Sequence, residues 1–258
     1  MFSYENPNAI NLFTDASTSR YLFYDTTSVC SGFIAVHNKK QIMSDVRAFP
    51  SATSNFGELY AFFMAMNYIH YDATCKRLNG IEPACCIQYN IFSDSMYTIS
   101  AVKSWLPKWL SDPENIETYP EEKEVPILYK DLLQENPVQH QECMMHILNT
   151  ILSARVPINI YHIKAHRNYK SNRDVRSVQV KFAKKAKINI DDVPFEWIKD
   201  LMFWNEKVDK MTRNYLKQIV ATPRLMQQYR RMKSQYTWPI QVFPSDAQSI
   251  NQHQVLVR

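Results

Sequence analysis

Glycine is scarce in this chain of 258 residues, which has only Gly32, Gly57 and Gly80. So few glycines exclude a glycine-rich phosphate loop of the GxGxxG or Walker type. No apolar run approaches the roughly 18 residues of a transmembrane helix, and the N-terminal segment MFSYENPNAI lacks a signal-peptide pattern. The five cysteines are odd in number and form no CxxC pair, which argues against a disulfide framework or a structural zinc site. We therefore expect an intracellular, cytoplasmic protein in a reducing environment.

Positive charge is also lacking in the first part of the chain. Residues 1–159 carry 11 Lys and Arg against 17 Asp and Glu, a net charge of −6, and residues 160–258 carry 19 against 8, a net charge of +11, which together give +5. A basic half indicates a polyanionic partner, most often nucleic acid, although solvated lysines alone can produce the same count. With 45% hydrophobic residues, the chain can form one large domain, or a smaller domain with an appendage.

The apolar segment from Cys85 to Phe92 predicts an interior strand that leads directly to Asp94. Open α/β sheets bind ligands at the carboxyl ends of their strands, so an acid at this position is a site candidate. The alternative is that Asp94 only caps the helix that begins near Ser95.

Clean alternation from Ala9 to Asp15 predicts another strand that ends on an aspartate. Residues 31–36 and 41–48 follow as strands after short connections, which indicates an antiparallel meander.

The next segment, residues 51–71, is a long apolar helix by its spacing, and Glu58 lies in its first turns. Glu58 shares one face with an apolar stripe made by Phe62, Ala65, Met66 and Ile69. A buried carboxylate is costly unless it is paired or bound to a metal. The alternative is a glutamate that favours the helix N-terminus and leans out to solvent.

The predicted order is β-β-β-α-β-α-α-β-α, with further helices over 95–110, 127–152 and 175–187 and a last strand over 157–163. The strands on either side of the Glu58 helix must pair in parallel through a crossover, which brings Asp15 and Asp94 to one edge below Glu58. Three like charges so close together persist only if divalent cations neutralise them, and oxygen ligands select Mg²⁺ or Mn²⁺.

The chain resembles the type 1 ribonuclease H family. The matching pieces are Phe13-Thr14-Asp15-Ala16-Ser17, Thr53-Ser54-Asn55-Phe56-Gly57-Glu58-Leu59, Ser93-Asp94-Ser95-Met96-Tyr97, and Lys164-Ala165-His166 with Asn172 six residues later. The resemblance implies an α/β fold with a five-stranded mixed sheet, three antiparallel strands followed by parallel ones, flanked by helices. We expect residues 1–188 to form this catalytic domain and residues 189–258 to form a basic, aromatic helical extension and tail.

The resemblance implies hydrolysis of the RNA strand of RNA/DNA hybrids with two Mg²⁺ ions, for which Mn²⁺ could substitute. Asp15, Glu58 and Asp94 would hold the metals, and His166 would assist product release or proton transfer. The family has a fourth acid about ten residues after the histidine, where alignment places Gln179; Asp174 is our preferred fourth ligand. The expected nucleic-acid contacts are Asn55, Ser95, Trp105, Trp109, Lys164, Arg167, Asn172 and Arg173.

Two other functions stay open from the sequence. One is a DNA nuclease of the same fold, of the resolvase, integrase or exonuclease type; the other is a non-catalytic nucleic-acid-binding module, which a glutamine at the fourth position would favour. The predicted helices at 194–220 and 222–232 combine aromatic and basic residues, which suits either a lid packed on the core or a surface that follows a phosphate backbone. The Met, Tyr and Asn content suggests a virus or phage origin.

Overall fold

A five-stranded mixed sheet forms the centre of the protein in a computed structural model. The structure describes residues 8–23, 26–49, 52–106, 116–117, 127–128, 140–164 and 167–221, and also 224 and 227. The sheet has the strand order β3-β2-β1-β4-β7 and is built from β1 (Ala9–Phe23), β2 (Thr26–His37), β3 (Lys40–Phe49), β4 (Gln88–Ser93) and β7 (Ile158–His162). The first three strands pair antiparallel, whereas β4 pairs parallel with both β1 and β7. The predicted mixed sheet is confirmed.

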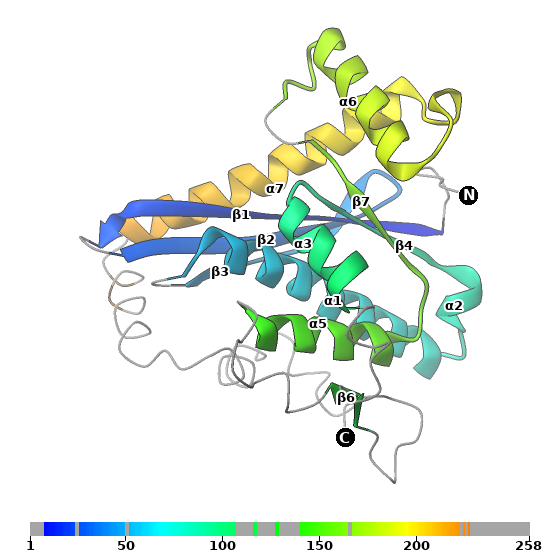
Figure 1. Ribbon diagram of the computed structural model, residues 1–258, viewed down its shortest axis with the longest axis horizontal. Coiled ribbons are helices and arrows are strands. Elements are labelled where there is room, and N and C mark those ends of the chain that lie inside the picture. The colour runs from blue at the N-terminus through cyan, green and yellow to red at the C-terminus, as the bar shows by residue number, and fades with distance from the viewer. Residues whose placement is uncertain are drawn as a thin grey trace.

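Helices cover both faces of this sheet (Figure 1). One face carries α1 (Ser54–Leu78), α3 (Met96–Ser100) and α5 (Gln141–Ala154), and the other carries α6 (Asn172–Ala186) and α7 (Phe195–Ala221). The smaller elements are α2 (Pro83–Cys86), a π-helical turn η1 (Ala101–Trp105), a 3-10 turn η4 (Ile190–Asp192) and a short hairpin of β5 (Ile116–Glu117) and β6 (Ile127–Leu128). In the part of the chain that the structure describes, no helix has the length and apolar character needed to cross a bilayer.

The alternation of β1 assigns its side chains to two separate cores. Leu12 is fully buried in the core formed with α1 and α5, whereas Phe13 is fully buried in the core formed with α6 and α7. Successive residues of a strand point to opposite faces, so every second residue of β1 faces α7. The C-terminal helix therefore completes the main core of the molecule and covers the second face of its sheet.

The start of α1 is fixed closely against the sheet. Thr53 caps the helix by accepting a hydrogen bond from the Phe56 amide at 3.1 Å, and Ser31 Oγ donates to the Gly57 carbonyl at 2.8 Å. A Cβ atom at Gly57 would overlap Val29 Cγ1 and would lie 2.9 Å from Ala16 Cβ. Glycine at this position lets the helix approach β1 and β2, which sets the position of the next residue, Glu58.

We expect Gly57→Ala to destabilise the protein by about 1–3 kcal/mol, because the added methyl group must push α1 away from the sheet. Urea denaturation in EDTA would measure this change. Ser54→Ala is the matched control, since Ser54 is exposed in the same helical turn. Equal stability of the two variants would contradict the close approach.

Three details of the predicted elements were wrong. β1 does not end at Asp15 but continues to Phe23 as part of a long antiparallel ribbon with β2. Cys85 and Cys86 are exposed in α2 and do not begin the interior strand, because Pro83 starts a helical turn there. Residues 127–128, expected to begin a helix, form strand β6, and α5 covers 141–152 of that predicted helix. The predicted helix over 95–110 is present as α3 and η1 up to residue 106, and residues 107–110 lie outside the described ranges. Of the predicted helix over 222–232, residues 224 and 227 are described, and both are helical.

Candidate active site

The end of β4 determines where the first two acids meet. Pairing between β1 and β4 runs up to Thr14 opposite Ser93, so Asp15 and Asp94 are the next residues on neighbouring parallel strands. β1 continues beyond this point with β2, and Asp15 is opposite Gly32 there. Asp15 is therefore buried in the middle of a strand, and its Oδ1 accepts a hydrogen bond from the Ala16 amide at 2.8 Å.

Glu58 joins these two aspartates from the first turns of α1. One carboxylate oxygen from each of Asp15, Glu58 and Asp94 lies within 4.8 Å of the others. This confirms that the three acids converge, as the strand order and the helical spacing predicted. Asp94 is therefore more than a helix cap, and Glu58 does not lean out to solvent; both single-residue alternatives are rejected.

Burial and mutual repulsion act strongly on Asp15. Burial raises the pKa of Asp15 well above its ordinary range, and the charges of Asp94 and Asp209 raise it further. The Ala16 amide and the Arg213 guanidinium act in the opposite direction and lower this pKa. Asp15 therefore carries its negative charge at neutral pH only at a cost that a bound cation would offset.

The pKa of Glu58 is raised by the same two causes, burial and neighbouring negative charge. Burial raises the pKa of Glu58 well above its ordinary range, followed by the charges of Asp15 and Asp94, with a smaller contribution from Asp209. The Glu58 Oε2 atom is buried without a hydrogen-bond partner in the described structure. A buried, unpartnered carboxylate oxygen beside two other carboxylates is a fitting ligand for a hard divalent cation.

The helix α7 lies along β1 and faces the acid cluster. The rings of Phe13 and Trp204 stack with their centroids 6.4 Å apart, and Ser17 Oγ lies 2.7 Å from Thr212 Oγ1. Eight helical residues rise about 12 Å, and four strand residues span about 13 Å, so the two segments stay in step between these contacts. Asp15 lies between the two contacts on β1.

On α7, Asp209 occupies the matching position between Trp204 and Thr212. Asp209 pairs with Arg213 one turn later, through a carboxylate-to-guanidinium hydrogen bond. Its charge raises the pKa of both Asp15 and Glu58, so Asp209 lies close enough to influence the cluster of three acids from the side of α7.

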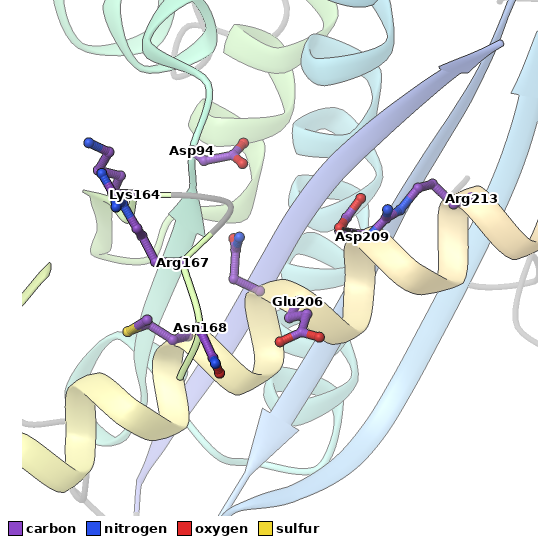
Figure 2. A pocket seen from close by; sticks show the side chains of 9 residues that line it. Asp94, Lys164, Arg167, Asn168, Glu206, Asp209 and Arg213 are labelled. Carbon is purple, nitrogen blue, oxygen red and sulfur yellow. Dashed lines mark hydrogen bonds and ion pairs between the residues drawn. The ribbon is translucent and has the colours of Figure 1, made fainter. Parts of the chain in front are cut away.

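A cavity of about 290 Å³ opens between Asp94 and α7 (Figure 2). Asp94 projects from the end of β4, Asp209 and Arg213 lie on α7, and Lys164 and Arg167 come from the segment after β7. The remaining lining residues are Asn168, Met202, Asn205 and Glu206. The cavity is thus lined by acids and by cations, a combination that suits a metal-bound phosphate.

Asn205, which lines this cavity, is a further group with an unpartnered oxygen. Its side chain is 5% exposed, and its Oδ1 atom has no hydrogen-bond partner within the described residues. Buried amide oxygens are normally satisfied, so an unsatisfied one beside a carboxylate cluster indicates a ligand or an ordered water.

The structure does not bring Asp174 or Gln179 into the cluster. Asp174 lies at the start of α6, where it accepts a hydrogen bond from the Asn168 amide at 3.2 Å and faces Arg167. Gln179 is buried, and its Nε2 donates to the Val193 carbonyl at 2.6 Å. Asp174 thus orders the loop before α6, and Gln179 joins α6 to the segment before α7.

The sequence interpretation did not name Asp209, because it searched for a fourth acid close to the histidine. Asp209 lies one helix further along the chain, on α7. A signal was present: Asn205 and Thr212 lie at helical spacing among the apolar residues Leu201 and Val208, so a polar stripe on an otherwise buried face marks this part of α7.

The predicted nucleic-acid contacts have varied surroundings. Lys164 and Arg167 line the cavity, and Asn55, Asn172 and Arg173 are exposed at the starts of α1 and α6. Ser95 caps α3 by accepting from the Thr98 amide at 3.2 Å. Trp105 is 36% exposed and contacts Tyr97 edge to face. Trp109 and His166 lie outside the described residues.

A mixed sheet in which Asp15 and Asp94 come directly after the paired segment of two parallel strands defines an α/β protein that can hold divalent cations at that edge. The family model for RNase H matches residues 7–186, and the chain belongs to this family. It is therefore a ribonuclease H-type hydrolase, as the sequence motifs predicted. The helix α7, which carries Asp209, lies beyond the matched residues.

Solved structures with a similar fold have low sequence identity to this chain. The foamy viral protease-reverse transcriptase in complex with dsDNA is 18% identical, with a TM-score of 0.43 over 71% of this chain and 99% of that chain. The same kind of protein in complex with RNA/DNA hybrid is 18% identical with a TM-score of 0.43, and the match covers 72% of this chain and 21% of that chain. LC11-RNase H1, isolated from compost by a metagenomic approach, is 15% identical with a TM-score of 0.38 over 69% of this chain and 99% of that chain. No curated protein sequence matches the chain.

Proposed function

We propose that this protein hydrolyses the RNA strand of RNA/DNA hybrids at the acid cluster of Asp15, Glu58, Asp94 and Asp209. The observation that carries the proposal is the meeting of the first three carboxylates within 4.8 Å in a chain of the RNase H family. The position of Asp209 across the cavity, and its electrostatic effect on Asp15 and Glu58, support its role as the fourth acid.

These residues fit two Mg²⁺ ions, or Mn²⁺ in their place, because they offer several carboxylate oxygens in a small volume. Such ions, when bound, activate an attacking water and stabilise the departing oxygen of a phosphodiester. Asp15 is oriented by the Ala16 amide, and Asp94 is placed by the end of β4.

The cations that line the cavity would act on the substrate and on Asp209. Lys164 and Arg167 can bind the phosphate oxygens that flank the scissile bond, and Arg213 can hold the Asp209 carboxylate in place. His166 would assist product release or proton transfer, and contacts to 2′-hydroxyls would select the RNA strand. The predicted contacts Asn55, Ser95, Trp105, Asn172 and Arg173 would line the path of the hybrid outside the cavity.

The test is cleavage of end-labelled RNA/DNA hybrid, double-stranded RNA, double-stranded DNA and a branched DNA junction in Mg²⁺ or Mn²⁺. We expect cutting of the hybrid alone, on its RNA strand. Asp94→Asn should reduce the rate on the order of 10²–10³-fold and leave hybrid binding in place, because the amide keeps the shape and removes the ligand charge.

Other outcomes of this assay would indicate a different function. Cutting of DNA or junctions that is lost in Asp94→Asn would indicate a DNA nuclease of this fold. Salt-sensitive binding without cutting in either metal would indicate a non-catalytic binding module, and it would overturn the proposed hydrolysis.

A further inference from the structure

A second cavity lies on the other side of Asp94, between β7 and α6. It has a volume of about 420 Å³, and we call it the lysine pocket after the residues that dominate its lining. Its walls are Asp94, His162, Lys164, Val178, Lys181, Phe182 and Lys185. Asp94 lines both cavities, so the lysine pocket continues directly from the candidate active site.

Three lysine side chains repel one another in this pocket. Close contact with Lys181 lowers the pKa of Lys164, and the charges of Arg167 and Lys185 lower it further. Burial, followed by the charge of Lys181, also lowers the pKa of Lys185. Like charges are brought together at a cost in free energy, and a bound anion removes that cost.

The described part of the chain supplies no acidic side chain that forms an ion pair with these lysines. Lys185 Nζ instead lies 3.1 Å from His162 Nδ1 and 3.2 Å from Met96 Sδ, which are neutral contacts that orient the amino group. Asp94 supplies one carboxylate to the lining against three lysines, so the pocket keeps an excess of positive charge.

One wall of the pocket is apolar, because Val178 and Phe182 belong to the buried face of α6. An apolar wall lowers the local polarisability and strengthens the attraction between an anion and the amino groups. Carboxylates are small and planar, whereas three amino groups around one hollow match the several oxygens of a phosphate group.

We propose that the lysine pocket, through Lys164, Lys181 and Lys185, binds a backbone phosphate of the nucleic acid whose neighbouring bond lies at the acid cluster. This inference rests on the proposed function for the identity of the ligand. The shared wall at Asp94 makes the pocket a continuation of the substrate path, so its occupant is a phosphodiester of the same bound strand.

The test compares Lys181→Gln/Lys185→Gln with the control Lys184→Gln/Lys187→Gln. Both pairs remove two positive charges from the end of α6, and all four lysines are exposed, so folding should be preserved. Lys184 and Lys187 do not line the pocket. Binding of a fluorescent RNA/DNA hybrid would be measured by anisotropy in Ca²⁺ at several KCl concentrations, and thermal stabilisation by sodium sulfate would be measured against sodium chloride at equal ionic strength.

We expect the pocket variant to bind hybrid about tenfold more weakly, with a salt slope smaller by about 1. Sulfate should stabilise it less than the wild type, leaving only the general effect of sulfate on folded proteins. The control should keep wild-type affinity, slope and sulfate response. Equal weakening in both variants would show a general charge effect and overturn the pocket, as would two variants that both behave like wild type.

The two proposals can fail separately. Hybrid cleavage by the wild type together with an unaffected pocket variant would overturn the lysine pocket and leave the hydrolase intact. A wild type that fails to cut hybrid, but whose hybrid binding and sulfate response depend on Lys181 and Lys185, would overturn the proposed function and leave the phosphate pocket standing.

Discussion

Asp209→Asn is expected to lower the rate of hybrid cleavage on the order of 10²–10³-fold, comparable to the loss of one strong electrostatic contact to a transition state. Asp209 lies on α7, which packs along β1, and its charge raises the pKa of both Asp15 and Glu58. Removing this charge should therefore weaken metal binding, which Mn²⁺ titration calorimetry would measure directly.

Asp174→Asn is the matched control, because it makes the same chemical change at the acid that the sequence interpretation preferred. The asparagine oxygen can still accept from the Asn168 amide, so the loop before α6 should keep its conformation. We expect cleavage and Mn²⁺ affinity to stay within a few-fold of wild type. If Asp174→Asn lost activity and metal affinity while Asp209→Asn kept both, the assignment of the fourth acid to α7 would be wrong.

Glu58→Gln should have two opposite effects, a large loss of activity and a gain in stability of the metal-free protein. The activity should fall on the order of 10²–10³-fold, since the amide is a weak metal ligand in place of a carboxylate. The unpartnered Oε2 atom and the repulsion from Asp15 and Asp94 make the ionised carboxylate costly without metal. Removing the charge should raise the free energy of unfolding by about 1–3 kcal/mol at neutral pH in EDTA.

The pH dependence of the free energy of unfolding tests the cost of ionising Asp15 and Glu58. The pKa values of Asp15 and Glu58 are raised in the folded protein, so the folded state binds protons more readily than the unfolded chain. The stability of the metal-free protein should therefore fall as the pH rises from the ordinary carboxyl range, near about 4, through the raised values. Above them both states are ionised, and the curve should level off.

Denaturant titrations from pH 5 to 8, in EDTA and in Mg²⁺, would follow this behaviour. Mg²⁺ at about 100 times its dissociation constant should restore about 2.7 kcal/mol to the wild type at neutral pH and much less to Glu58→Gln. If the stability of the wild type and of Glu58→Gln changed with pH in the same way in EDTA, ionising Glu58 would carry no cost. The electrostatic account of the site would then be wrong.

The edge of the sheet explains why three acids were predictable from the sequence. Asp94 follows an apolar run, Asp15 follows an alternating run, and Glu58 continues an apolar helical stripe, so each carries a local signal. Parallel pairing through a crossover helix then leaves little freedom in how these signals can meet. The same signals carried the resemblance to the ribonuclease H family that the family match confirms.

The exact length of β1 was not predictable in the same way. Local alternation ends at Asp15 in the sequence pattern, but the antiparallel partner β2 continues the strand to Phe23. Pairing partners decide where a strand ends, because backbone groups remain ordered as long as a neighbour accepts and donates hydrogen bonds. Asp15 consequently lies inside the sheet, where its burial perturbs its pKa.

The sequence by itself determined the fold class, the order of the elements along the chain, the pairing of the first and fourth strands, and the three acids of the cluster. Only the tertiary structure placed Asp209 near Asp15 and gathered three lysines around one pocket. Both depend on where α6 and α7 pack against the sheet, and that packing joins Ser17 to Thr212 and Lys185 to His162 across long stretches of sequence. Local periodicity shows which face of a helix is buried, but the position of the helix along the sheet is set by long-range packing.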